Sequence, residues 1–373
     1  MTDFAVVFTL KDEAALISRA LDYYHFTGAR QIYCFFDGSS DHTEEIARRC
    51  PVVVSNTSIQ PHEIEHRPQW IEEILPRWNT NADVRKRINA HYAARLAFKS
   101  GIEWLVVIDP DELFLPVGLD RLERGVLSSY FDSVDPAVDQ LLIKNIEAVP
   151  HKSGIVEPFA ECVYFTRRHA VTHFAARAGR AALRRVGLRS SAVDLYENLL
   201  YNLRFRFLLN REFVDPTGGT MVRGGQYIGY VNHKSAIRTS VAADANFNTH
   251  EWILDGAART MRLRNKQVGW MLHYDFYSAQ SIRSKFIKRE PILRMNGRNY
   301  RNTIARLALE LPAADFDRFF CVNLVERQIE QKISAGLLQR IDVVQNYFRR
   351  AHLMNCPEAT TDDPLEPDHP GNP

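Results

Sequence analysis

The sequence has few cysteines, no long apolar run and almost no net charge. Its five cysteines lie far apart and include no Cys-x-x-Cys pair, which argues against a disulfide scaffold and a cysteine zinc site. No apolar stretch approaches the ~20 residues of a membrane-spanning helix. The first residues lack the basic start and the small-residue cleavage site of a signal peptide. We therefore expect a cytoplasmic protein, and peripheral attachment to the inner face of a membrane stays open.

The charge balance also excludes two classes of protein. Lys and Arg total 47 against 45 Asp and Glu, a net charge of +2, so neither a polycationic nucleic-acid binder nor an acidic disordered chain is expected. With 373 residues, 45% of them hydrophobic, the chain can build one large core or two ordinary ones. Composition thus indicates a soluble globular protein with no nucleic-acid partner.

The first third of the chain alternates strand and helix patterns. Predicted strands are residues 4–10, 31–36, 51–54 and 104–108, and predicted helices are residues 14–28, 43–49 and 82–100. This alternation with short loops predicts an α/β fold, in which helices flank a doubly wound, mostly parallel sheet. Ligands of such sheets bind at the carboxyl ends of the strands.

The rest of the chain is less regular. We expect strands at 141–143 and 162–165, a helix at 196–209, a flexible loop at 217–225, helices over 304–351 and a proline-rich disordered tail at 356–373.

Three acidic clusters follow three of the predicted strands. They are Asp12 with Glu13, Asp37 with Asp41, and Asp109 with Asp111 and Glu112. Because the carboxyl ends of parallel strands meet at one edge of a sheet, the clusters are expected to face a common ligand site.

Asp109 and Asp111 can converge only if the chain turns sharply between them, and Pro110 favours such a turn. A hard divalent cation that also binds phosphate oxygens would relieve the repulsion between the two carboxylates. The alternative is that both acids cap the next element or face water, because the Asp-x-Asp pattern is short and frequent. The motif alone does not decide between the two.

The cluster around Asp37 has a similar ambiguity. Gly38 permits an unusual turn, Asp41 can cap the following helix, and Asp37 is left at the sheet edge. There it could accept a hydrogen bond from the N–H of a base such as uracil. A simple turn with a capped helix explains the same residues, as a charged helix start explains Lys11 to Glu13.

Taken in order, the motifs resemble the family 2-type glycosyltransferases, most closely the branch related to glycosyltransferase family 92. The resemblance covers residues 4 to about 290. The matching stretches are Lys11-Asp12-Glu13, Asp37 to Thr43, Trp104 to Phe114, Phe165 to Arg168, Lys234 to Arg238 with His250 downstream, and His273-Tyr274 with Ser278 and Lys285. Asp12 replaces the usual Asn, Leu113-Phe114 stands where Phe is commoner, and residues 170–231 look unlike the middle of that branch.

The resemblance implies a GT-A fold, a Rossmann-like sheet with helices, in residues 1–290. Within it, residues 1–115 would bind the nucleotide sugar and residues 116–290 the acceptor, followed by a helical C-terminal extension at 291–355. The implied activity is inverting transfer of a sugar from a nucleotide-sugar donor, a UDP-sugar, with Mn²⁺ or Mg²⁺ as cofactor. A glycan or lipid-linked molecule would be the acceptor, in polysaccharide biosynthesis.

The resemblance also implies roles for individual residues. The metal ligands would be Asp109, Asp111 and His273, and the donor-binding residues would be Glu13, Asp37, Asp41, Asp109, Lys234 and Arg238. Asp109 would also contact the ribose, and Lys234 or Arg238 would neutralise the charge of the departing diphosphate.

An inverting transfer needs a further carboxylate as general base near the acceptor hydroxyl. Glu147 and Glu157 lie in a suitable region of the sequence, but nothing there separates them from ordinary surface acids.

Three alternatives remain. One is a catalytically inactive protein that binds a nucleotide or a sugar, because the base is unidentified. The second is a zinc hydrolase, since His62 to His66 match the pattern H-E-x-x-H, although Pro61 and Pro68 favour a short surface turn there. The third is nucleotidyl transfer on a similar sheet, for which the first strand lacks the usual glycine-rich phosphate loop.

Overall fold

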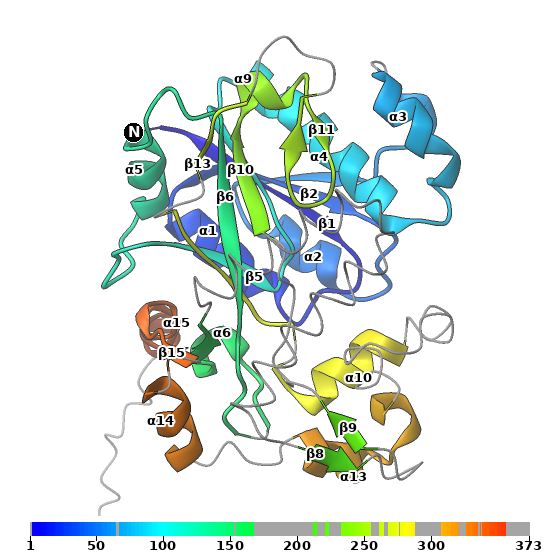
Figure 1. Ribbon diagram of the computed structural model, residues 1–373. Coiled ribbons are helices and arrows are strands. Elements are labelled where there is room, and N and C mark those ends of the chain that lie inside the picture. Colours follow the sequence, from blue (N-terminus) through cyan, green and yellow to red (C-terminus); the bar gives the residue numbers. More distant parts are fainter. Residues whose placement is uncertain are drawn as a thin grey trace, which may run out of the picture.

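A central sheet with helices on both faces organises the molecule (Figure 1). The computed structural model describes residues 2–64, 67–152, 154–167, 212–214, 221–223, 233–254, 261–264, 268–275, 277–287, 307–320, 326–334, 336 and 338–355. Among these residues, no helix combines the length and the apolar character needed to cross a membrane.

Nine of the described strands form the central sheet, in the order β3-β2-β1-β4-β10-β6-β14-β5, with β13 paired to β6. Their bounds are β1 Phe4–Leu10, β2 Ala29–Phe36, β3 Val53–Thr57, β4 Trp104–Val107, β5 Glu112–Pro116, β6 Gln140–Glu147, β10 His233–Arg238, β13 Leu263–Arg264 and β14 Gly269–His273.

The first four strands in chain order pair side by side in parallel, as the alternating pattern predicts. The mostly parallel α/β sheet is thus confirmed, with β10 and β5 as its antiparallel members. Because β10 is antiparallel to both β4 and β6, the direction of β6 is again that of β4, and β14 runs parallel to β6. The carboxyl ends of β1, β2, β4, β6 and β14 therefore share one edge of the sheet.

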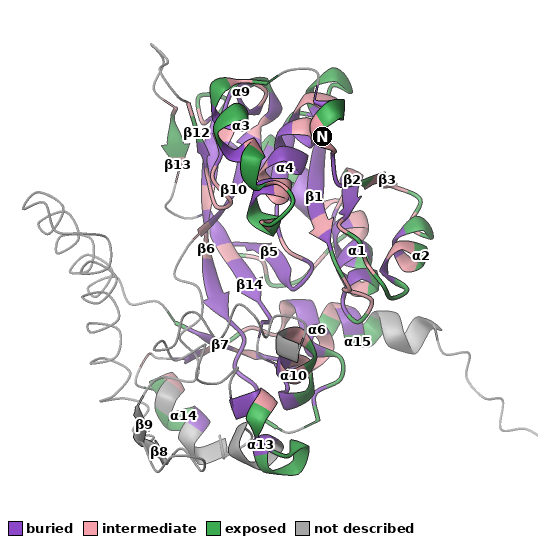
Figure 2. Ribbon diagram, turned by 90° about the vertical axis from the view of Figure 1, so that its right-hand side faces the viewer, coloured by how far each residue is buried: buried purple, intermediate pink, exposed green. Residues whose placement is uncertain are grey.

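The helices cover both faces and one edge of the sheet. Their bounds are α1 Ile17–Phe26, α2 Thr43–Arg48, α3 Gln69–Ile74, α4 Ala82–Lys99, α5 Val126–Asp132, α6 Pro158–Glu161, α9 Thr239–Ala242, α10 Ala279–Ile287, α13 Ala313–Phe320, α14 Glu326–Ser334 and α15 Val343–Asn355. Two 3₁₀ helices are Pro61–Glu63 and Leu75–Arg77. Both ribbon views place α6, α10, α13, α14 and α15 beyond the carboxyl edge of β6 and β14 (Figure 1 and Figure 2).

The core consists of two apolar layers because successive side chains of a strand point to opposite faces of the sheet. Phe4, Val6 and Phe8 of β1 belong to the layer that contains α1, whereas Ala5 and Val7 belong to the layer that contains α4. Every residue of β1 except Thr9 is buried, which explains its nearly continuous apolar sequence. Figure 2 shows the central strands as the buried interior of the molecule.

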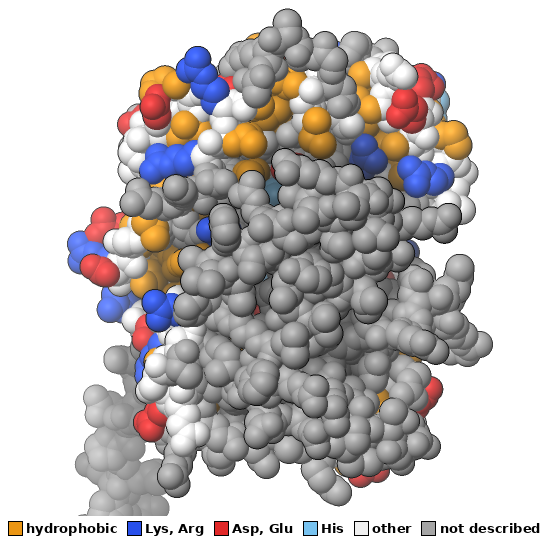
Figure 3. Space-filling view, in the orientation of Figure 1, with side chains coloured by type: hydrophobic (Ala, Val, Ile, Leu, Met, Phe, Trp, Pro, Cys, Tyr) orange, Lys and Arg blue, Asp and Glu red, His pale blue; other side chains and the backbone are white. Residues whose placement is uncertain are grey.

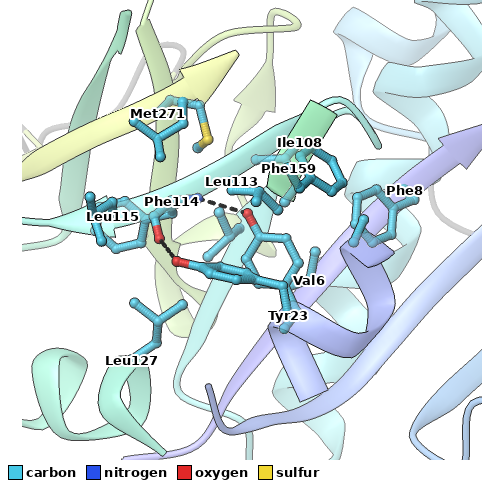
Figure 4. Packing of buried hydrophobic residues seen from close by; sticks show 14 of the residues in the cluster. Val6, Phe8, Tyr23, Ile108, Leu113, Phe114, Leu115, Leu127, Phe159 and Met271 are labelled. Carbon is cyan, nitrogen blue, oxygen red and sulfur yellow. Dashed lines mark hydrogen bonds between the residues drawn. The ribbon is translucent and has the colours of Figure 1, made fainter. Parts of the chain in front are cut away.

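Helix α1 also fixes β5, the strand that begins at the acidic edge. The Tyr23 hydroxyl donates to the Phe114 carbonyl oxygen at 2.5 Å, and the Phe114 amide donates to the Tyr24 hydroxyl at 3.0 Å (Figure 4). The Tyr24 hydroxyl in turn donates to the Glu112 carbonyl oxygen at 3.1 Å. Satisfying these buried polar groups locks the start of β5 against the core.

Three short two-stranded pairs complete the described structure. They are β7 Tyr164–Thr166 with β15 Leu338–Arg340, β8 Glu212–Val214 with β9 Met221–Arg223, and β11 Asn246–Phe247 with β12 Trp252–Ile253.

Some sequence predictions need correction. The flexible loop expected over 217–225 contains β9, because this segment completes its backbone hydrogen bonds with β8. The third strand begins at Val53, two residues later than predicted, because a turn closes from the Val53 amide to the Cys50 carbonyl. The helical stretch expected over 304–351 contains the strand β15. The helix predicted at 196–209 and the tail at 356–373 lie outside the described residues.

The last helix, α15, joins the same apolar layer as β1 and α1. Phe348 stacks against Tyr23 and Phe159, with ring centroids 6.5 and 5.7 Å apart, and Tyr347 contacts Phe26 at 4.6 Å. Where Figure 3 colours the side chains, basic and acidic ones are interspersed among hydrophobic ones.

Candidate functional site

The acidic clusters lie where the sequence places them, directly after β1, β2 and β4 at the common carboxyl edge. The chain reverses between Asp109 and Glu112, as predicted for the Asp-Pro-Asp sequence. The Glu112 amide donates to the Asp109 carbonyl oxygen at 3.0 Å, and the Glu112 carboxylate accepts from the Asp109 amide at 2.9 Å. This turn leaves the Asp111 side chain buried at the edge of the sheet.

Asp111 belongs to the candidate metal cluster, which we define as Asp111, His273 and Asp275. One ligand atom from each residue lies within 4.8 Å of those of the other two, and all three side chains are buried. His273 ends β14 and Asp275 follows two residues later, so both come from the strand end at the same edge. Asp275 was not predicted from the sequence, although His273-Tyr274-Asp275 repeats at β14 the pattern of an acid placed just after an apolar strand.

His273 is oriented by Glu147, the residue opposite it on β6. The Nδ1 atom of His273 lies 2.8 and 2.9 Å from the two carboxylate oxygens of Glu147, and the Nε2 atom lies 3.7 Å from Asp111 Oδ1. A carboxylate on one ring nitrogen fixes the ring so that the other faces a metal, the usual support of a metal-binding histidine. Burial alone would lower the pKa of His273, but Glu147 and Asp111 raise it to about 10.

The cluster suits Mn²⁺ or Mg²⁺ because it offers two carboxylates and one imidazole, whose Nε2 would have to release its proton when it binds a metal. It differs from the predicted metal ligands, which were Asp109, Asp111 and His273. Asp109 lies outside the cluster and is paired with two lysines instead.

Lys86 and Lys234 hold Asp109 from two sides. The Lys234 ammonium lies 2.6 Å from Asp109 and 2.8 Å from Glu112, and Lys86 also pairs with Asp109. Since β10 runs antiparallel to β4 with Ser235 opposite Val107, Lys234 extends past the end of β4 toward Asp109. Burial would raise the pKa of Asp109, but the two ammonium groups hold it well below its usual value.

Lys285 of α10 brings a third ammonium group to the edge. Its Nζ lies 3.0 Å from Asp111 Oδ2 and also pairs with Asp275. Burial acts to raise the pKa of Asp111, but Lys285 and His273 keep it below its usual value. The buried carboxylates of the edge are thus balanced by three lysines and one histidine.

Asp37, predicted to face a nucleoside, is largely buried against Arg85 of α4. Its two carboxylate oxygens accept from Arg85 at 2.6 and 2.8 Å, and one also accepts from the Ser58 hydroxyl at 2.9 Å. The Trp78 ring lies 5.7 Å from the Arg85 guanidinium. Base recognition by Asp37 stays a prediction, and in this structure its carboxylate is already paired.

The loops that follow β1 and β2 are bound to each other. The Asp12 carboxylate accepts from the Ser40 amide at 2.7 Å, the Asp41 carboxylate accepts from the Ala14 amide at 3.2 Å, and the Glu13 amide donates to the Thr43 hydroxyl at 2.7 Å. Asp12 has a φ of +56°, a left-handed conformation that Asn and Asp adopt more readily than most residues. Asp12 therefore fits the place where the resembled family usually has Asn.

Arg238 needs correction as a donor-binding residue. It stands at the opposite end of β10 from Lys234, level with Trp104 at the start of β4. Its guanidinium lies 4.5 Å from the Trp104 ring and pairs with Glu103. The antiparallel direction of β10 places Arg238 at the amino edge of β4, away from the acidic clusters.

The two candidate bases have different environments. Glu147 is buried and paired with His273, as described above. Glu157 precedes α6, is 48% exposed and lies 3.2 Å from Arg19 of α1.

The segment around His62 does not have the helical structure that an H-E-x-x-H zinc site needs. The 3₁₀ helix that contains His62 ends at Glu63, and Ile64 is extended, so the helix that the pattern requires does not continue past Glu63. The Glu63 carboxylate accepts from the Gln60 amide at 2.6 Å, as expected of a short capped turn. His66 itself lies outside the described residues.

Comparison with known proteins gives a limited sequence similarity. No family model matches the chain. Two glycosyltransferase-like proteins of Arabidopsis thaliana are each 23% identical to it, over 154 and 155 residues. These matches cover 39% of this chain and 34% and 30% of the relatives, so the chain spans about a third of the length of the curated relatives it matches. The branch related to family 92 stays a prediction.

Solved structures superpose weakly. Glucosyl-3-phosphoglycerate synthase from Mycobacterium tuberculosis, in complex with Mn²⁺, UDP and glucosyl-3-phosphoglycerate, is 17% identical and covers 49% of this chain and 50% of its own, with a TM-score of 0.24. A cytidylyltransferase from Leptospira borgpetersenii is 11% identical and covers 38% of this chain and 54% of its own, with a TM-score of 0.22. At these TM-scores the superpositions carry no argument. What the comparisons establish is that part of this chain is similar in sequence to glycosyltransferase-like proteins.

Proposed function

We propose that this protein is a metal-dependent glycosyltransferase that uses a nucleotide-sugar donor. The observation that carries the proposal is the candidate metal cluster, in which Asp111, His273 and Asp275 converge at the carboxyl edge of the sheet. Ligand sites of open α/β sheets lie at this edge. The sequence similarity to glycosyltransferase-like proteins supports the same activity.

Each part of the site has a role in this proposal. The cluster would hold Mn²⁺ or Mg²⁺, and the ion, when bound, neutralises the donor's diphosphate and stabilises the leaving nucleotide. Glu147 holds the His273 ring so that Nε2 faces Asp111. The lysine pairs keep Asp109 ionised at the rim, where it can accept a hydrogen bond from a ribose hydroxyl. Asp37, paired with Arg85, would form the wall of the site at its nucleoside end.

We further propose a UDP-sugar donor and a single displacement with inversion. The required base would be a carboxylate with access to the acceptor. Glu147 does not suit this role because both of its oxygens face His273. Glu157 remains the candidate, since its carboxylate is partly exposed. On the basis of the family resemblance, we also propose a glycan or lipid-linked acceptor. The same resemblance suggests a role in polysaccharide assembly at the cytoplasmic face of a membrane.

The test is nucleotide diphosphate release from a panel of nucleotide sugars with Mn²⁺. We compare the wild type, Asp111→Asn and the control Asp132→Asn, which alters an exposed acid on α5. We expect Mn²⁺-dependent release from at least one donor, with a loss of about a hundredfold or more in Asp111→Asn and none in the control.

Two outcomes would contradict the proposal. Full release by Asp111→Asn would show that the candidate metal cluster is not the site of the reaction. Binding of a nucleotide sugar without turnover on any acceptor would instead favour the inactive binding protein.

A further inference from the structure

The Lys285 ammonium group contacts the two carboxylates that a metal ion in the candidate metal cluster would bind. This group lies 3.0 Å from Asp111 Oδ2 and contacts Asp275 Oδ1, so it bridges the two carboxylates of the candidate metal cluster. His273 approaches the other oxygen of Asp111, at 3.7 Å. A positively charged side chain of the protein itself therefore already contacts both carboxylates of the candidate metal cluster.

A divalent ion and this ammonium group cannot both keep their contacts with the two carboxylates. Mn²⁺ or Mg²⁺ binds carboxylate oxygens at about 2.0–2.2 Å. An ion on Asp111 Oδ2 would then lie within about 5 Å of Lys285 Nζ, where two positive charges in a buried site repel strongly. One cation has to leave, and Lys285 carries its charge on a flexible, partly exposed side chain.

Lys285 can withdraw without disturbing the sheet. It lies in the last turns of α10, and its side chain is 25% exposed, whereas those of Asp111 and Asp275 are 10% and 3% exposed. A flexible four-carbon stem allows the ammonium group to turn toward solvent. The backbone of the ligands, in contrast, is fixed, since the Tyr274 amide between His273 and Asp275 donates to the Asp111 carbonyl oxygen at 2.8 Å.

We propose that Lys285 is a built-in counter-cation that holds Asp111 and Asp275 in place in the metal-free protein and competes with the divalent ion for them. This inference rests on the proposed metal-dependent function. It implies that the protein binds the ion alone weakly, because the ion must displace Lys285 first.

The experiment measures the affinity for Mn²⁺ alone by calorimetry and by electron paramagnetic resonance of the free ion, with no nucleotide present. We expect Lys285→Met to bind Mn²⁺ about tenfold more tightly than the wild type, and Lys285→Arg, which keeps the charge, to bind no more tightly than the wild type. Lys152→Met is the matched control, because Lys152 pairs with Glu161 outside the cluster.

A second readout is the melting temperature of the metal-free protein. Lys285→Met should melt below the wild type without Mn²⁺, because two buried carboxylates lose one of their cationic neighbours, and Mn²⁺ should raise its melting temperature by more than that of the wild type. If the Met variant does not fold, Lys285→Gln, which keeps a hydrogen-bond donor, should shift Mn²⁺ affinity in the same direction.

Equal or weaker Mn²⁺ binding by both uncharged variants, with clear binding by the wild type, would overturn the role of Lys285 and leave the metal site intact. Failure of the wild type and all variants to bind Mn²⁺, in the presence or absence of a nucleotide diphosphate, would overturn this inference together with the proposed function.

Discussion

His273 illustrates how single residues build this site. Its ring lies between Glu147 and Asp111, and the strand register places Glu147 directly opposite it. Glu147 was predicted as a candidate base because an acid lay in the right region of the sequence. Its pairing with His273 was not predictable, since two residues 126 positions apart meet only through the arrangement of β6 and β14.

Glu147→Gln tests the orienting role. The amide keeps the volume but loses the charge that fixes the His273 ring, so we expect Mn²⁺ affinity to fall about 10- to 100-fold. The measurement is a Mn²⁺ titration at fixed pH, with Glu157→Gln as the control that should leave metal affinity unchanged. Equal affinities in the Glu147 variant and the wild type would show that Glu147 does not support the metal ligand.

Lys234→Met tests the buried ion pairs beneath the site. The ammonium group is buried between Asp109 and Glu112, and removing it takes the lysine from Glu112 and leaves Asp109 paired with Lys86 alone. We expect the free energy of unfolding to fall by about 3–5 kcal/mol in urea. Lys152→Met removes the ammonium group of a side chain that is 51% exposed and should cost less than about 1 kcal/mol. A comparably small loss for Lys234→Met would contradict the buried pairing.

At the scale of elements, the strand ends were the most predictable part of the molecule. β1, β2 and β4 are apolar runs followed at once by acids, and this local pattern was enough to place three clusters at one edge. β10 was harder because its direction depends on pairing with β4, which no local signal carries. Arg238 was assigned to the wrong end of the sheet for this reason. Asp275 was missed although its position after β14 follows the same rule as Asp109.

Asp41→Ala tests the contact between the loops after β1 and β2. Asp41 accepts hydrogen bonds from the amides of Ala14 and Thr43, at 3.2 and 3.0 Å, and we expect its removal to cost about 1 kcal/mol near pH 7. Asp41→Asn, which keeps an acceptor oxygen, should cost less.

The pH dependence of this loss has a definite sign. Burial would raise the pKa of Asp41, but the hydrogen bonds from Thr43 and Ala14 lower it below 3.8. Its stabilising effect is therefore complete above the unfolded-state pKa and disappears as the pH falls through the lowered folded-state pKa. The difference in melting temperature between wild type and Asp41→Ala should shrink below about pH 4, and a constant difference down to about pH 3 would contradict this account.

At the scale of the whole molecule, the C-terminal helix α15 packs into the same apolar layer as β1. The helical pattern of this segment was predictable from its apolar spacing, but its partner was not, because the contact between Phe348 and Tyr23 spans most of the chain. Core contacts of this kind depend on the complete fold. The segment around β15 was likewise expected to be helical, and pairing with β7 determines its conformation instead.

Phe348→Ala tests the integration of α15. The ring is 2% exposed, and truncating it should lower the free energy of unfolding by about 3–5 kcal/mol. Because α15 shares the layer of β1, tryptophan fluorescence and far-UV circular dichroism should report coincident transitions at lower urea. The exposed Arg350→Ala should change stability by less than about 0.5 kcal/mol. A loss confined to helical signal, with fluorescence unchanged, would show that α15 is an independent appendage.

Anomalous diffraction at the manganese edge, from crystals grown with Mn²⁺ and a nucleoside diphosphate, tests the candidate metal cluster most directly. We expect one strong peak within coordination distance of Asp111, His273 and Asp275, with diphosphate oxygens as the other ligands and the Lys285 ammonium displaced. A peak on Asp109 away from this cluster, or a nucleotide bound with no manganese between it and Asp111, would show that the cluster is not the metal site.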